Sequence, residues 1–265
     1  MEQYKQAFDS MMWVKTEPNE HEVALIQRGQ KYISKLANIP GVEMIAIVNS
    51  LSMYATHPES DIDLFIVTRP GTIWFVRFWA TLILWTHGVW RRDRDIAGNL
   101  CLSFFITTEA MDLSHIAIEN DIYLYYWIYY MRPIIDKNGT YEKFLLANSW
   151  VDGDEEQRKM NKKWQFKVSN SVVSVIPGLS RNLENKEGIP IYAGFLPSQE
   201  WQNTRSVYKK LNTIIRYLLF PRTQSTYEKL GQPEWVIISD QMLKFHDKDR
   251  RKTIRDTILE NNFDK

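Results

Sequence analysis

Segments patterned as helices and as strands alternate along residues 21–107, and this alternation constrains the fold more than any other feature. The expected helices are His21–Leu36 and Thr72–Gly88, and the expected strands are Glu43–Val48, Asp61–Thr68 and Leu100–Thr107. Glycine and proline stand in several of the connections, where they favour turns. The pattern predicts a small mixed sheet packed on helices, which is an α+β fold.

The remainder of the chain favours helices. These are expected at Glu119–Met131, at Tyr141–Trp150, at Lys159–Val175, at Val207–Phe220 (stopped by Pro221) and at Lys248–Asn261, with a short strand at Trp235–Ile238. An acidic stretch at Asp152–Gln157 predicts a boundary between a first domain at 1–151 and a mostly helical C-terminal region at 152–265.

The charge balance excludes one large class of function. Among 265 residues, 33 are Lys or Arg and 32 are Asp or Glu, so the net charge is +1. A protein that coats DNA needs a net basic face, and we expect no such role here. The single cysteine permits no intramolecular disulfide, and the first residues lack a secretory pattern. Both features favour a cytoplasmic location.

The longest apolar run, Ile73–Trp90, bears on a membrane role. Arg77 and His87 interrupt it, and it is short for a bilayer span of ~20 apolar residues. We therefore expect a core helix and no membrane partner, with a membrane-surface helix as the alternative.

Two aspartates carry the strongest chemical signal. Asp61 and Asp63 lie two positions apart in an expected strand, so their side chains point to the same face. Ile62, Leu64 and Ile66 take the opposite face, toward a core. Adjacent carboxylates repel each other unless a cation compensates. Mg²⁺ prefers oxygen ligands, and such ions neutralise a leaving pyrophosphate in phosphoryl transfer.

A serine that could bind phosphate stands eleven positions before Asp61. Ser50 follows the strand Glu43–Val48, and Leu51–Tyr54 after it can form a helix. Free N–H groups at a helix N-terminus attract phosphate, although an ordinary helix cap uses the same geometry. Ser50 and the aspartates would then flank one pocket. Asn49 and Ser60 are further candidate contacts, and Ser60 also fits a plain turn.

The spacing resembles a known family. Ser60-Asp61-Ile62-Asp63-Leu64 begins ten positions after Ser50. The nucleotidyltransferase superfamily of DNA polymerase beta type carries Gly-Ser, a short helix, and then Asp-x-Asp on the next strand. The resemblance covers residues 43–107 and implies a mixed sheet of nucleotidyltransferase type. It also implies Mg²⁺ on Asp61 and Asp63, terminal phosphates at Ser50, and transfer of a nucleoside monophosphate from a nucleoside triphosphate to a hydroxyl acceptor.

Two positions depart from the glycines of that pattern. Asn49 stands where the family has the first glycine, and asparagine tolerates left-handed backbone better than most residues. Tyr54 stands where small members usually carry a second glycine.

The third departure concerns catalysis. The family usually places a third carboxylate on the following strand, but here Cys101, Ser103 and Phe105, or the residues of opposite parity, would face the site. Ser103 is the expected equivalent. Asp95 and Glu109 flank this strand and are the acids that could reach in.

Three functions therefore compete. The first is a Mg²⁺-dependent nucleotidyltransferase, with its unknown acceptor bound by the helical second half. The second is a catalytically degenerate nucleotide-binding module. The third is a membrane-associated interaction protein that uses Ile73–Trp90 or Val207–Phe220 as an apolar surface. Arg91, Arg92 and Arg94 could meet an anion, but we expect a solvated loop there.

Overall fold

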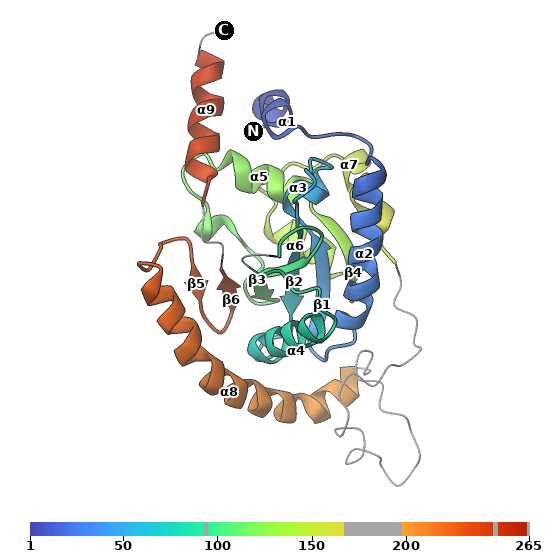
Figure 1. Cartoon of the computed structure of the whole chain (residues 1–265), viewed down its shortest axis with the longest axis vertical. Helices are drawn as coiled ribbons and strands as arrows, with labels where there is room; N and C mark the ends of the chain where they lie inside the picture. The colour runs from blue at the N-terminus through green and yellow to red at the C-terminus, as the bar shows by residue number, and fades with distance from the viewer. Residues whose placement is uncertain (93–94, 167–197, 246–248, 264–265) are drawn as a thin grey trace.

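A mixed β-sheet lies at the centre of the computed structural model, which describes residues 1–92, 95–166, 198–245 and 249–263 (Figure 1). Among these residues six strands form one sheet in the order β4-β1-β2-β3-β6-β5. Their bounds are Val42–Ile47 (β1), Ile62–Thr68 (β2), Leu100–Thr107 (β3), Arg132–Asp136 (β4), Ile237–Ile238 (β5) and Met242–Lys244 (β6). The α+β class expected from the sequence is confirmed.

The strand directions bring three chain segments to one edge of the sheet. β1 pairs with β2 antiparallel, so the end of β1 lies beside the start of β2. β2 pairs with β3 parallel, so the start of β3 lies there as well. A parallel pair requires a crossover, and α4 (Ile73–Thr86) provides it. The expected serine turn and aspartate pair therefore meet at this edge.

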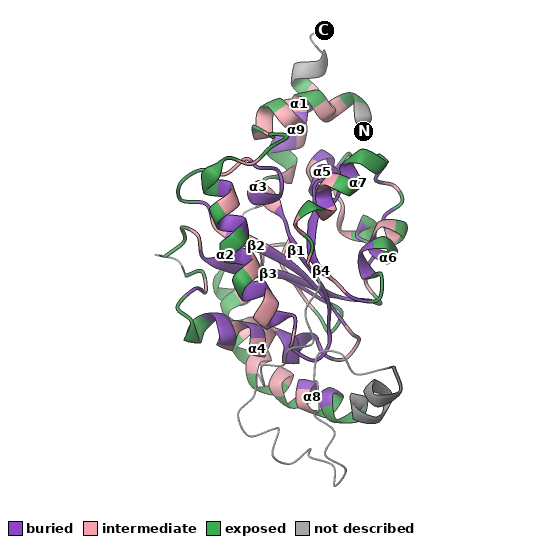
Figure 2. Cartoon of the chain, turned by 90° about the vertical axis from the view of Figure 1, so that its right-hand side faces the viewer, coloured by how far each residue is buried: buried purple, intermediate pink, exposed green. Residues whose placement is uncertain are grey.

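Helices cover both faces of the sheet (Figure 2). One face packs on α2 (Glu20–Leu36), α4 and α8 (Ser198–Lys229). The other packs on α5 (Ile122–Tyr129) and α6 (Thr140–Ala147), and α1 (Lys5–Met12) and α9 (Arg251–Phe263) extend the same apolar cluster beyond α5. The shorter helices are α3 (Asn49–Ser52), α7 (Glu155–Asn161) and 3-10 turns at Glu2–Tyr4, Ser114–Ile116 and Lys162–Trp164.

The alternation of side chains along β2 explains the two layers. Ile62, Leu64 and Ile66 are buried in the cluster beneath α2 and α4, as the pattern predicts. Phe65 and Val67 are buried in the second cluster, beneath α5 and α6. Only the start of the strand, where Asp63 lies, is left half-buried on this second face. The position of the charged pair is thus set by where the second helix layer ends.

Two sequence predictions about helix ends are wrong. Pro221 does not stop the helix that contains it, because α8 runs through it to Lys229. Pro221 is exposed and α8 is curved (Figure 1). Water can therefore hydrate the carbonyl that lacks its N–H partner, and the curvature of the helix makes room for the proline ring. The helix expected over Lys159–Val175 ends early: α7 passes into a 3-10 turn that ends at Trp164. Residues 167–175 lie outside the described residues.

The predicted domain boundary falls between α6 and α7. Strands from beyond it, β5 and β6, continue the sheet next to β3, with Phe104 opposite Lys244. Beyond the boundary the described residues are mostly helical, as expected. The division into 1–151 and 152–265 stays a prediction.

The outer face of α8 bears on the membrane hypothesis. Val207, Ile214, Tyr217 and Leu218 are exposed on it. Within the part of the chain that the structure describes, no helix combines the length and the apolar character needed to cross a bilayer. Association of α8 with a membrane surface stays a prediction.

Candidate functional site

The two aspartates converge with a cysteine at the sheet edge. Asp61 directly precedes β2 and Asp63 lies within it, while Cys101 of β3 is the register partner of Asp63. One ligand atom from each of the three lies within 4.8 Å of the others. The carboxylates thus face the same side, as their spacing predicts, and they are close enough for one cation to contact both.

Burial makes this pair of carboxylates hard to ionise. Burial raises the pKa of Asp63, and the charge of Asp61 raises it further, to about 6, although hydrogen bonds from Asn49 and Cys101 oppose the shift. Burial also raises the pKa of Asp61, against the opposing charge of Arg91. A carboxylate loses hydration on burial and gains repulsion from a like charge. A divalent cation would relieve both penalties.

Arg91 compensates part of this charge from the exposed loop that the sequence predicts. Its Nε lies 3.0 Å from Asp61 Oδ2, and its Nη1 donates to Cys101 Sγ at 3.7 Å. The segment is placed by its own backbone, because the Arg91 N–H donates to the Leu100 carbonyl. Arg92 is exposed, and its backbone exchanges hydrogen bonds with the backbone of Asp95. Arg94 lies outside the described residues.

The third side chain of this group is a thiol, where the resembled family usually has a carboxylate. Cys101, rather than the expected Ser103, is opposite Asp63, because the register between β2 and β3 shifts just beyond this pair. Burial raises the pKa of the Cys101 thiol, as do the charges of Asp63 and Asp61, so the thiol stays protonated. It donates a hydrogen bond toward the carboxylates.

The acids that flank β3 do not join this group. Asp95 is exposed in the turn with Arg92, and Glu109 borders a separate cavity of about 300 Å³ near Asp112 and His115. Over the described ranges, the His, Cys, Asp and Glu side chains that lie close enough together to hold a metal ion are Asp61, Asp63 and Cys101. Asp95 and Glu109, the two acids that the sequence offers for the third carboxylate, therefore lie outside this group.

The turn before the aspartates has the backbone that glycines usually adopt. Asn49 has φ 57° and Tyr54 has φ 53°, both in the left-handed region that few non-glycine residues enter. These are the two positions where the resembled family carries glycine. Asparagine tolerates this region better than most residues, which is consistent with its place at the first of these positions.

Asn49 links the carboxylates to the aromatic residues of α5. Its Oδ1 accepts hydrogen bonds from Tyr123 Oη (3.1 Å) and Trp127 Nε1 (2.8 Å). Its side chain also hydrogen-bonds to Asp63. Since the amide oxygen faces the two aromatic donors, the amide nitrogen is the atom that donates to the carboxylate.

The two serines have different surroundings. Ser50 is half-buried in the first turn of α3, directly after Asn49. Ser60 is buried in a turn, where its Oγ accepts from the His57 N–H at 3.0 Å. Ser50 remains a candidate phosphate contact, whereas Ser60 fits the plain turn that the sequence also allowed.

A buried arginine that sequence reasoning missed holds this turn in place. Arg132 Nε donates to the Ser52 carbonyl at 2.6 Å, and its guanidinium carbon lies 3.9 Å from the centroid of the Tyr54 ring. Its Nη1 donates to the Met160 carbonyl at 3.0 Å, and Trp164 Nε1 donates to Tyr54 Oη at 2.8 Å. No local pattern marks Arg132, because its partners are distant in sequence.

A cavity of about 590 Å³ opens on the other side of Asn49. Its walls include Phe104 of β3 and Tyr123, Leu124 and Trp127 of α5. Segments far along the chain from these complete the lining, with Met11 and Met12 of α1, Ile116, Lys244 of β6, and Asp249, Arg250, Arg251, Thr253 and Ile254 at and before the start of α9. No local pattern in the sequence indicates this cavity, because the segments that line it come from both halves of the chain.

The fold and site define an α+β protein with a carboxylate pair at one sheet edge. None of the family models, curated proteins or solved structures compared with the chain matches it. The function must therefore be argued from the site.

Proposed function

We propose that the protein is a Mg²⁺-dependent nucleotidyltransferase that transfers a nucleoside monophosphate from a nucleoside triphosphate to a hydroxyl acceptor. The observation that carries the proposal is the convergence of Asp61 and Asp63 beside the Asn49–Ser50 turn. The raised pKa of Asp63, to about 6, indicates a site whose charge is incompletely balanced by the protein alone.

The backbone of the turn supports a nucleotidyltransferase-type fold. A left-handed conformation at Asn49 and at Tyr54 costs free energy for residues other than glycine. Arg132 and the Asn49 hydrogen bonds stabilise it here. The chain therefore retains at these two positions the conformation that the family pattern requires, despite different residues.

The donor set fits a hard divalent cation. Asp61 and Asp63 would hold Mg²⁺, which when bound would neutralise charge on the triphosphate and the leaving pyrophosphate. Ser50 would contact the terminal phosphates. Arg91 is 40% exposed on its side chain and pairs with Asp61, so it is free to turn toward a phosphate oxygen, which a guanidinium binds well.

A second candidate function is nucleotide binding without transfer. It is favoured by the thiol of Cys101, which stands opposite Asp63 where no third carboxylate is present among the described residues. A protonated thiol neither holds a second metal ion as a carboxylate does nor accepts a proton from a hydroxyl.

Turnover of labelled nucleotides separates the two candidates. Nucleoside triphosphates labelled at the α-phosphate are incubated with Mg²⁺, with water standing in for the acceptor. We expect slow formation of labelled nucleoside monophosphate and pyrophosphate in equal amounts. Asp61→Asn should abolish it, because a metal ligand is lost, and Glu59→Gln, which changes an exposed acid in the same loop, should retain it. Magnesium-dependent binding with no monophosphate formed would contradict transfer and favour the binding module.

A further inference from the structure

The cavity beside Asn49 combines apolar walls with a cationic end. Tyr123 and Trp127, which hydrogen-bond to Asn49, form the part next to it, and Phe104 and Leu124 add further apolar wall. The cationic part comprises Lys244, which is the register partner of Phe104, together with Arg250 and Arg251, and Asp249 is the one carboxylate among the described lining residues. A volume of about 590 Å³ is typical of sites for small organic molecules.

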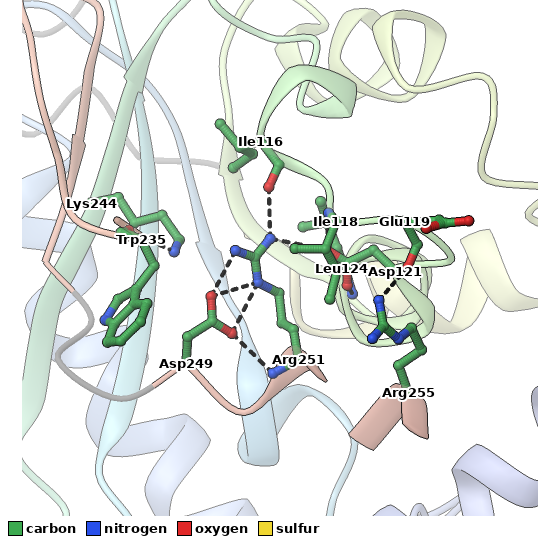
Figure 3. A network of polar contacts seen from close by, with 10 residues as sticks. All are labelled: Ile116, Ile118, Glu119, Asp121, Leu124, Trp235, Lys244, Asp249, Arg251 and Arg255. Atoms are coloured by element: carbon green, nitrogen blue, oxygen red, sulfur yellow. Dashed lines mark hydrogen bonds and ion pairs between the residues drawn. The ribbon is translucent and has the colours of Figure 1, made fainter. Parts of the chain in front are cut away.

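The charge of Arg251 is balanced by partners within the protein. It pairs with Asp249 (2.6 Å) and with Asp121 at the start of α5 (2.9 Å), and it donates to the Ile116 carbonyl at 2.7 Å (Figure 3). These contacts fasten α9 to α5 and close one side of the cavity. Arg255 adds a bond from the next turn of α9 to the Glu119 carbonyl, 3.0 Å away.

Lys244 differs from Arg251 in its partners. Its Nζ donates to the Trp235 carbonyl at 3.0 Å, and within the described ranges no carboxylate lies at ion-pair distance from it (Figure 3). Burial lowers its pKa to about 8, and the charge of Arg251 adds to this, yet it stays mainly protonated at neutral pH. Arg250 is exposed at the same end. A bound anion would relieve this unbalanced positive charge.

We propose that this cavity binds an amphipathic organic anion, with an aromatic or alkyl body against Phe104, Leu124 and Trp127 and its anionic group at Lys244. One part of this inference rests on the proposed function, namely that the bound molecule carries a hydroxyl near Asn49 and accepts the nucleoside monophosphate. Asn49 contacts both the cavity wall and Asp63, so a hydroxyl there lies next to the carboxylate pair.

A matched pair of fluorescent probes tests the proposal on the full chain. The anion 8-anilinonaphthalene-1-sulfonate and the neutral N-phenyl-1-naphthylamine share one aromatic body and differ in the sulfonate. We expect saturable binding of both, with the anion tighter. Lys244→Met should weaken binding of the anion by about tenfold or more and leave binding of the neutral probe unchanged, since it removes the partner of the sulfonate and keeps an apolar side chain of similar length. Lys252→Met, an exposed α9 residue outside the cavity lining, should change neither.

Other results would overturn the proposal. One is equal affinity of the anionic probe for wild type and for Lys244→Met. The other is unchanged binding of both probes to Leu124→Trp, in which the larger side chain fills the cavity, provided that this variant has the circular dichroism spectrum of wild type. Displacement of the anion by magnesium ATP would overturn the acceptor assignment, because the nucleotide would then occupy the cavity. If the wild-type protein binds the probes but does not bind magnesium ATP, the proposed function is contradicted and the proposed anion site is still supported.

Discussion

Replacing Asp63 by asparagine is expected to raise the melting temperature of the metal-free protein at pH 7. Burial and the neighbouring Asp61 raise the pKa of Asp63 to about 6 from an ordinary value of 3.8, so its negative charge destabilises the folded state. Asparagine keeps the shape and removes the charge. The expected gain is about 3 kcal/mol, or roughly 6–12 °C for a chain of this size.

The sign of the effect fixes its pH dependence. A carboxyl whose pKa is raised on folding contributes stability that is complete below the unfolded value, near pH 4, and is lost as the pH rises through about 6. The difference between variant and wild type should therefore be absent near pH 4 and reach its full size by pH 7. Differential scanning calorimetry in a chelator measures it. A constant difference across this range, or a destabilised variant at pH 7, would show that Asp63 is an ordinary strand-end residue.

Replacing Arg132 by methionine is expected to cause the largest loss of stability. The change leaves the buried Ser52 carbonyl without its donor, takes one donor from the half-buried Met160 carbonyl, and removes the guanidinium from the Tyr54 ring. One unsatisfied buried acceptor and the loss of the ring contact cost about 3 kcal/mol together, which lowers the melting temperature by roughly 6–12 °C. Thermal unfolding followed by circular dichroism measures this.

Arg222→Met is the matched control for that experiment. Arg222 is exposed on α8, and substitutions at such sites usually change stability by less than about 0.5 kcal/mol. Equal effects of the two variants would mean that Arg132 does not hold the turn that carries Asn49 and Ser50.

The sequence was sufficient for the features that depend on local pattern. Alternation along residues 61–68 predicts which side chains of β2 enter the core and that Asp61 and Asp63 point the same way. The tolerance of asparagine for left-handed backbone predicts the conformation of Asn49. Each depends on a residue and its immediate neighbours, and therefore on chemistry that is visible in the sequence.

The remaining parts of the site depend on contacts between distant segments. Cys101 faces Asp63 because of a register shift between β2 and β3, and no residue type announces such a shift. Arg91 reaches Asp61 because the loop before β3 returns along it. The cavity exists because β6 and α9, from the end of the chain, pack beside α5. Such partners become visible only when the chain is folded.

The central claim is that Asp61 and Asp63 together hold a magnesium-bound triphosphate. The most direct measurement is calorimetric titration of each non-hydrolysable nucleoside triphosphate analogue into wild type, into the Asp61→Asn/Asp63→Asn double variant and into Glu59→Gln, with and without Mg²⁺. The account predicts binding of at least one analogue that requires Mg²⁺, weakens by at least about tenfold in the double variant, and persists in Glu59→Gln. Equal affinity in all three proteins, or no effect of Mg²⁺, would contradict it.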